Sequence, residues 1–341
     1  MPLDFRKLPK IELHCHLDAS VRLATVADLG REIGLTLPEP LAPALVAPEI
    51  CLDLADFLLR IDLALEVMQH REQLVRIARE FVEDLAAEGV IYGEVRFAPQ
   101  LHLRQGLSLQ EVVDAVHEGL LRGQRQTGVA TGLILCCLRH ESAQSSLAIA
   151  KLALANRDKV CALDLAGDEA RFSGRAHAEA FALARAEGLR RTVHAGEAAG
   201  PDSIREALDL LGAERIGHGV RIEESAEVED AVKRAAVALE MCPLSNVQTR
   251  AASALVAHPI DRLLRSGLRV TVSTDARTVS LTTVSAEFAR LAQTFGWGME
   301  EFWRCQYHAA DAAFVSPQAR AALVSRLAEG NISGAPVAEP R

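Results

Sequence analysis

The chain has 341 residues, of which 49% are hydrophobic and 24% charged, an ordinary balance for a globular protein. The formal net charge of −9 disfavours a nucleic-acid-binding role, for which a basic face is expected. No run approaches the ~20 apolar residues of a membrane span, and the N-terminal MPLDFRKLPK lacks the apolar core of a signal peptide, so we expect no membrane partner.

Short apolar runs alternate with longer helical patterns along the chain. Near-continuous apolar runs are typical of strands buried on both faces of a parallel sheet, so we expect apolar strand interiors. The predicted strands span 10–16, 90–99, 129–138, 160–167, 190–196, 215–219, 237–245 and 268–275, and helices are predicted at 71–89, 108–128, 174–188 and 202–212. This alternation predicts an α/β fold, a (β/α)8 TIM barrel in one domain over residues 1–341. A doubly wound open sheet is the alternative, although no G-x-G-x-x-G motif follows the first strand.

Two segments break the alternation. Residues 36–56 are rich in Pro and Ala, and a helix is expected over 54–69. Together they predict a helical insertion at 36–70, after the first barrel unit, which is a candidate lid over the catalytic side. The Gly- and Pro-rich tail at 330–341 is expected to be disordered.

The seven cysteines include no C-x-x-C pair, and most lie inside apolar runs. This pattern is typical of buried free thiols in a reducing compartment, so we expect a cytoplasmic protein.

Polar residues that bind metals end several predicted strands. Because active sites of such barrels lie at the carboxyl ends of the strands, these residues are candidates for one site. The first strand ends in His14, His16 and Asp18, the fourth leads into Gly167, Asp168 and Glu169, the fifth ends in His194 with Glu197 close behind, and the sixth and eighth end in His218 and Asp275.

His14 and His16 point to the same side of a strand because they are two residues apart. Alone, the pair is a weak metal signal, and two satisfied core histidines are the alternative. His194 and Asp275 at other strand ends strengthen the metal interpretation. Three imidazoles and one carboxylate suit a single Zn²⁺ per chain, which lowers the pKa of a bound water towards ~7.

Glu197 and His218 are candidates for moving protons next to this centre. The Glu197 carboxyl could exchange a proton with a bound substrate, unless it is a solvated loop residue. His218 could orient the reactive water or take its proton, unless it is a buried structural histidine.

Several sequence blocks together resemble the adenosine deaminase family of the amidohydrolase superfamily. The blocks follow the family's order and intervals, and weaker similarity spans nearly the whole chain. They read PKIELHCHLDAS, LDLAGDE, TVHAGE, RIGHG, CPLSN and STD.

The resemblance implies a role for each matching residue and a hydrolytic reaction that releases ammonia from an aminopurine. His14, His16, His194 and Asp275 match the zinc ligands, Glu197 the acid that protonates the purine ring nitrogen beside the amino-bearing carbon, and His218 the residue that orients and deprotonates the water. Substrate contacts are implied for His16, for Asp18 at the ribose hydroxyls and for the backbone N–H of Gly167 at a purine nitrogen. Phe57, Leu58 and Ile61 resemble the family's apolar gate, with an ordinary packed helix face as the alternative.

The chain departs from the family pattern after its first and last predicted strands. Ala276 stands where a second aspartate, which contacts the imidazole part of the purine, is usual. Ala19 replaces the usual glycine after Asp18. Arg277 adds a positive charge that could meet a carboxylate or phosphate at the mouth, although a structural arginine is the alternative.

The expected function is therefore zinc-dependent deamination of adenosine and 2′-deoxyadenosine to inosine and 2′-deoxyinosine. A deaminase of a modified adenine nucleoside such as aminodeoxyfutalosine is the alternative, and free adenine is less favoured because Asp18 implies a ribose site. A catalytically inactive relative would be expected to lack a ligand or the acid, and this chain keeps both. The expected partners are a small purine nucleoside and water, and the sequence makes no prediction of oligomeric state.

Overall fold

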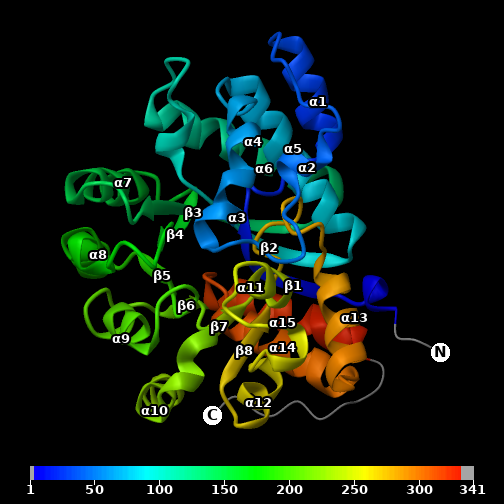
Figure 1. Ribbon diagram of the computed structural model, residues 1–341, viewed down its shortest axis with the longest axis vertical. Coiled ribbons are helices and arrows are strands. Elements are labelled where there is room, and N and C mark those ends of the chain that lie inside the picture. The colour runs from blue at the N-terminus through cyan, green and yellow to red at the C-terminus, as the bar shows by residue number, and fades with distance from the viewer. Residues whose placement is uncertain (1–3, 332–341) are drawn as a thin grey trace.

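The computed structural model describes residues 4–331, and a closed barrel of eight parallel strands forms its centre (Figure 1). Neighbouring strands pair in sequence order, and Cys15 pairs with Asp275 to join the first strand to the segment after the last. The backbone N–H of His16 donates to the Asp275 carbonyl at 2.7 Å across this junction. The strands are β1 (Lys10–His16), β2 (Val90–Phe97), β3 (Ala130–Leu138), β4 (Val160–Ala166), β5 (Arg190–Ala195), β6 (Arg215–His218), β7 (Ala238–Met241) and β8 (Arg269–Val272). The barrel prediction is confirmed, and the open sheet is wrong.

Helices surround the barrel, and α7, α8, α9 and α10 follow one another around its outside in Figure 1. The predicted helices correspond to α5 (Arg71–Ala87), α6 (Leu109–Thr127), α8 (Ala178–Ala186) and α9 (Pro201–Asp209). Outside the insertion, the other α-helices of the described residues are α1 (Leu23–Glu32), α7 (Ala143–Ala155), α10 (Ala226–Ala235), α11 (Pro243–Gln248), α12 (Ile260–Arg265), α13 (Val284–Phe295), α14 (Met299–Ala312) and α15 (Pro317–Gly330). Gly330 thus belongs to a helix, and the rest of the tail expected to be disordered lies outside the described residues, except Asn331.

Helix α6 shows how local sequence sets an element's limits. Ser108 caps its start by accepting the backbone N–H of Glu111, and Gly128 ends it with φ 76°. Gly119 allows α6 to approach α5 closely, because a Cβ there would lie 2.4 Å from the carbonyl oxygen of Val75.

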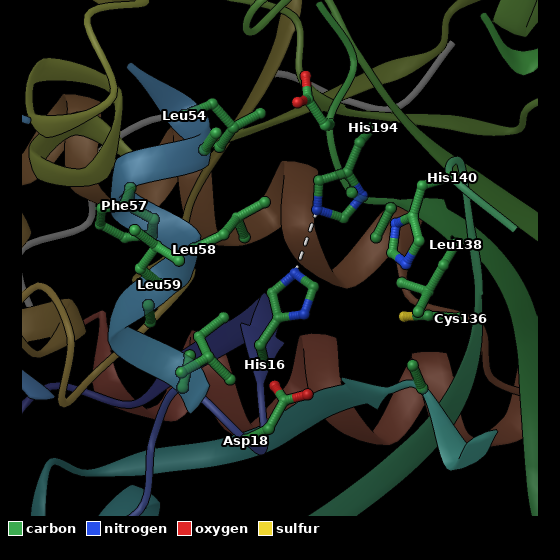
Figure 2. A pocket seen from close by; sticks show the side chains of 18 of the residues that line it. His16, Asp18, Leu54, Phe57, Leu58, Leu59, Cys136, Leu138, His140 and His194 are labelled. Atoms are coloured by element: carbon green, nitrogen blue, oxygen red, sulfur yellow. Dashed lines mark hydrogen bonds between the residues drawn. The ribbon is translucent and has the colours of Figure 1, made fainter. Parts of the chain in front are cut away.

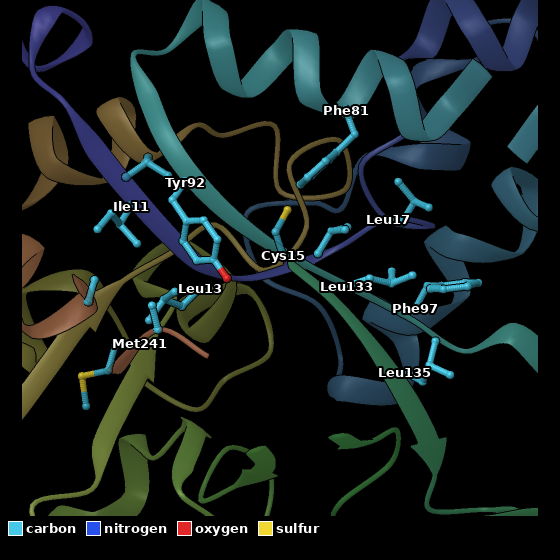
Figure 3. Close-up of a cluster of buried hydrophobic side chains, with 14 of the residues drawn as sticks. Ile11, Leu13, Cys15, Leu17, Phe81, Tyr92, Phe97, Leu133, Leu135 and Met241 are labelled. Atoms are coloured by element: carbon cyan, nitrogen blue, oxygen red, sulfur yellow. The ribbon is translucent and has the colours of Figure 1, made fainter. Parts of the chain in front are cut away.

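The main hydrophobic core lies between the strands and the surrounding helices (Figure 3). Phe81 of α5 and Leu13 and Cys15 of β1 belong to this cluster, and Figure 3 shows Phe81 on the side of Cys15. All seven cysteines are free, and six are buried, as expected. No helix among residues 4–331 is both long enough and apolar enough to cross a membrane.

The insertion between α1 and α5 contains α2 (Ala42–Leu45), α3 (Leu54–Leu58), the 3₁₀ turn η2 (Leu59–Ile61) and α4 (Asp62–Glu66). The helix expected over 54–69 is confirmed over residues 54–66, although its middle turn, η2, is 3₁₀ and not α-helical. Residues 54–59 all border the same pocket. The 3₁₀ turn between α3 and α4 interrupts the regular helix where the segment borders the pocket.

Candidate active site

The four residues predicted as metal ligands come together at the carboxyl ends of β1, β5 and β8. Nε2 of His16 lies 3.1 Å from Nε2 of His194 and 3.5 Å from Oδ1 of Asp275. Nε2 of His14 lies 3.3 Å from the same oxygen. The four ligand atoms all lie within 4.8 Å of one another.

This donor set fits a metal ion of the zinc type. Ligands placed tetrahedrally at about 2.0–2.1 Å from an ion are about 3.3 Å apart, close to the separations of 3.1, 3.3 and 3.5 Å found here. Nε2 of His14 is buried and has no aligned hydrogen bond within residues 4–331. Its lone pair is therefore available to a cation, and the nitrogen-rich set favours Zn²⁺ over Mg²⁺ or Ca²⁺.

Buried carboxylates behind the histidines fix how the rings are protonated. Nδ1 of His14 lies 2.7 Å from Oε2 of Glu240, and Nδ1 of His194 lies 3.1 Å from Oδ2 of Asp164. The guanidinium of Arg96 joins the two carboxylates at 2.8 Å each. Because an ionised carboxylate only accepts, both rings donate through Nδ1 and turn their Nε2 lone pairs to the centre.

The sequence did not predict this network, because apolar strand interiors were expected. That expectation is wrong, since several strands contain buried charged side chains. The barrel interior has its own layer of side chains, in which opposite charges from different strands pair. The signal was available as charged residues inside otherwise apolar strands. Buried examples are Lys10, Glu12, Glu94, Arg96, Asp164, Arg191, Arg215 and Glu240.

Asp275, which follows β8, and His218, which ends β6, have an unusual backbone conformation. Their φ angles are 63° and 64°, in the left-handed region that residues other than glycine rarely adopt. Ser245 Oγ donates to Oδ2 of Asp275 at 2.6 Å, which holds the carboxylate with Oδ1 towards the histidines. Such backbone strain is typical of functional positions.

Glu197 lies in a loop that the Glu169 carboxylate organises. That carboxylate accepts the backbone N–H groups of Gly196 at 2.6 Å, Glu197 at 2.9 Å and Ala198 at 2.7 Å. Thr249 Oγ1 donates to Oε1 of Glu197 at 3.0 Å. Burial, reinforced by nearby Asp275 and Glu169, raises the pKa of Glu197 well above its usual range. Glu197 is only 4% exposed, so it is no solvated loop residue, and its raised pKa favours the protonated carboxyl.

His218 lies between Glu197 and the metal-ligand cluster. It is 1% exposed, its Nε2 is 3.5 Å from Oε2 of Glu197, and its ring centroid is 4.6 Å from that of His14. Nδ1 lies on the far side of the ring, 3.0 Å from Nδ2 of Asn246. Burial lowers the pKa of His218 well below its usual value.

A cavity of about 740 Å³ opens onto these groups (Figure 2). Asp18 lies at one side of it, and Oδ1 of this buried carboxyl has no hydrogen-bond partner within the described residues. Burial raises the Asp18 pKa to about 6. Gly167, with φ 100°, brings backbone to the cavity wall. Both positions suit contacts to a polar ligand.

The insertion forms the opposite wall. In Figure 2, Leu54 of α3 lies across the open space from Cys136 and Leu138 of β3, and Phe57 and Leu58 of the same helix also line the cavity. Ile61 of η2 also lines the cavity, so the three candidate gate residues all border it.

Ala276 lines the cavity within an apolar cluster that includes Ala19, Phe57 and Val279. The methyl groups of Ala19 and Ala276 leave this part of the wall without a polar side chain. Arg277, which the sequence placed near the mouth, lies behind the wall, where it pairs with Glu12 at 3.1 Å. The structural alternative for Arg277 is therefore the one supported, because its guanidinium neutralises a buried carboxylate.

A closed parallel barrel with histidines and a carboxylate gathered at its carboxyl end is the architecture of an amidohydrolase-type TIM barrel. The family model for adenosine deaminase matches residues 9–330. An adenosine deaminase from Clostridium botulinum (strain Okra / Type B1) is 39% identical over 333 residues, which cover 96% of this chain and 99% of that protein. The chain belongs to the adenosine deaminase family, and it is a hydrolytic deaminase acting on C–N bonds.

Solved structures of related deaminases share the fold. An adenine deaminase from Arthrobacter aurescens has a TM-score of 0.89 and 30% identity, covering 94% of this chain and 98% of that one. The N6-methyl-AMP deaminase of Arabidopsis thaliana has a TM-score of 0.86 and 28% identity, covering 96% and 98%. An amidohydrolase from Burkholderia ambifaria with bound Zn has a TM-score of 0.87 and 25% identity, covering 95% and 91%.

Proposed function

We propose that this protein is a zinc-dependent aminohydrolase that converts adenosine and 2′-deoxyadenosine to inosine and 2′-deoxyinosine, releasing ammonia. The observation that carries the proposal is the convergence of three imidazole nitrogens and Asp275 in one cavity with the buried Glu197, whose pKa is raised. The 39% identity to an adenosine deaminase supports adenosine as substrate.

One Zn²⁺ per chain would be held by His14, His16, His194 and Asp275. When bound, it supplies hydroxide at neutral pH by lowering the pKa of a coordinated water towards ~7. The zinc-bearing amidohydrolase of similar fold supports this choice of metal.

The chain's own groups bind the nucleoside and move the proton. Glu197 holds its proton on the oxygen that does not accept from Thr249, so Oε2–H faces the cavity and donates to the purine ring nitrogen. The unpaired Oδ1 of Asp18 accepts from ribose hydroxyls. The Gly167 N–H and the exposed edge of His16 complete the contacts to the substrate.

We propose that residues 36–70 act as a lid whose gate is formed by Phe57, Leu58 and Ile61. These three side chains line the cavity from one side, on a segment of short helical turns inserted between α1 and α5. Closure would exclude water from the purine.

A modified adenine nucleoside such as aminodeoxyfutalosine is the second candidate substrate. The observation that favours it is an apolar rim, in which Leu52, Leu59 and Phe172 line the cavity yet remain 79%, 61% and 40% exposed. Arg171 also lines the cavity, where it pairs with Asp168. Such a rim suits a nucleoside with an apolar extension ending in an anion.

Free adenine is less favoured, although an adenine deaminase shares the fold, because the buried Asp18 would then lack a partner. We place the reaction in the cytoplasm, where seven free cysteines remain reduced.

The test is steady-state kinetics with adenosine, 2′-deoxyadenosine, adenine and aminodeoxyfutalosine as substrates. We expect the largest kcat/KM for the first two. A kcat/KM for adenosine thousands of times below that of another member would overturn adenosine as the substrate.

A further inference from the structure

The His218 ring is one end of a chain of hydrogen bonds that leads away from the cavity. Its Nδ1 lies 3.0 Å from Nδ2 of Asn246, whose Oδ1 lies 3.2 Å from Nε2 of His258. Nδ1 of His258 lies 3.2 Å from the backbone nitrogen of Ile260. The three side chains are at most 3% exposed, so bulk water does not compete for these bonds.

Two backbone N–H groups fix the direction of every bond in this chain, because a backbone N–H can only donate. Cys242 N–H donates to Oδ1 of Asn246 at 3.2 Å, which identifies that atom as the oxygen and turns the NH₂ group towards His218. Ile260 N–H makes Nδ1 of His258 an acceptor, so neutral His258 carries its proton on Nε2 and donates to the same oxygen. The Cys242 N–H and the His258 Nε2–H therefore both identify the same atom of the Asn246 amide as its oxygen.

The Asn246 NH₂ group therefore donates to Nδ1 of His218. A neutral His218 then carries its proton on Nε2, the nitrogen that faces Glu197 and the reaction centre. Adding a second proton at Nδ1 would set the N–H of His218 against the N–H of Asn246 at 3.0 Å, a separation too short for a water molecule to lie between them.

We propose that Asn246, oriented by the Cys242 N–H and by His258, is a positioning residue that holds His218 as the neutral tautomer with hydrogen on Nε2. His218 then acts on the incoming water oxygen as a hydrogen-bond donor and not as its base. This inference rests on the proposed function for the role of His218, whereas the tautomer itself does not depend on any substrate. Of the two roles that the family resemblance implied for His218, it retains orientation and removes deprotonation.

The tautomer is measured directly by ¹⁵N NMR of the whole protein with ¹⁵N-labelled histidine. The two nitrogens of a neutral imidazole give well-separated pyrrole-type and pyridine-type resonances, and the His218→Gln variant assigns them by loss of signal. We expect a pyrrole-type Nε2 and a pyridine-type Nδ1. A protonated Nδ1 in the wild-type protein would overturn the proposal, whichever substrate the enzyme uses.

Asn246→Asp reverses the hydrogen bond to His218 with little change in shape. Its carboxylate still accepts from Cys242 N–H and His258, but it now accepts from Nδ1 of His218 instead of donating. We expect a protonated Nδ1, and a kcat for the best substrate of the panel lower by about 100- to 1,000-fold, the usual loss for one donor at a reaction centre, with KM within a few-fold.

The matched control is Asn156→Asp. Asn156 is also buried, and its oxygen accepts from Gln110 at 2.8 Å and Lys159 at 3.1 Å, outside the cavity. We expect its kcat to match wild type. An Asn246→Asp variant with an unchanged His218 tautomer would overturn the role of Asn246, and one with a reversed tautomer and full kcat would overturn the donor role of His218. If this variant does not fold, the wild-type spectrum still decides.

Discussion

Replacing Glu197 by Gln separates its chemistry from its packing. The side chain is 4% exposed, and burial raises its pKa well above the usual range, which favours its neutral form. Gln is neutral and of the same shape. Thr249 Oγ1 would still donate to Oε1, leaving an NH₂ group where Oε2–H faces the cavity. The variant keeps a hydrogen-bond donor but has no proton to transfer.

We therefore expect kcat for adenosine to fall by about 100- to 10,000-fold, the usual contribution of a general acid, with KM within about threefold. The assay is ammonia release under steady-state conditions. Thr249→Val is the matched comparison, because it removes one hydrogen bond of about 0.5–1.5 kcal/mol and should lower kcat by about two- to tenfold. A Glu197→Gln variant that keeps a tenth or more of wild-type kcat would refute the assignment of the proton donor.

The same substitution has a stability consequence in the metal-free protein. The folded-state pKa of Glu197 lies above its usual value of 4.5, so its contribution to stability is fully present below that pH and is lost as pH rises through the folded-state pKa. The glutamine side chain of the variant does not titrate and makes no such pH-dependent contribution. The Tm of the variant minus that of wild type should therefore increase between pH 5 and pH 9, and a constant difference would contradict the shift.

Three further changes test the substrate wall and the core. Asp18 should bind the ribose hydroxyls best as a carboxylate. Because burial raises its pKa to about 6, KM for adenosine should rise as pH falls below that value. In the Asp18→Asn variant this rise in KM should disappear. Ala276→Asp should lower KM for adenosine by about two- to tenfold, because it adds one hydrogen bond of about 0.5–1.5 kcal/mol, and it should also lower Tm. An unchanged KM would mean that the imidazole part of the purine does not lie beside residue 276. Arg277→Met should reduce the free energy of unfolding by about 3–5 kcal/mol by leaving Glu12 buried and unpaired, as urea denaturation would show, with kcat of the folded protein unchanged.

The sequence predicted the barrel and its metal-ligand cluster because both follow from short-range patterns. Apolar runs predict strands locally, and the carboxyl ends of parallel strands meet at one end of a barrel. This places His194 and Asp275 beside His14 and His16 although far apart in sequence. The insertion was harder, because apolar spacing predicts one regular helix over 54–69 and does not show that its middle turn, η2, is 3₁₀.

The charged groups behind the site were not predicted, because each depends on a partner from another strand. Arg96 reads as an isolated charge in β2, and only closure of the barrel brings Asp164 and Glu240 to its guanidinium. Arg277 likewise reads as an exposed loop residue until Glu12 of β1 is placed beside it. Glu169 belongs to the LDLAGDE block, which the sequence identifies. Its role in holding the Glu197 loop does not follow from the sequence, because that role depends on where the backbone N–H groups of the loop lie.

Metal removal and replacement tests the central claim most directly. The whole protein would be stripped with a chelator, its metal content measured, and ammonia release from adenosine followed as zinc is added back. The account predicts no turnover in the metal-free protein and full recovery at one equivalent of zinc per chain. Undiminished turnover by protein shown to contain no metal would contradict it, as would recovery that requires two equivalents.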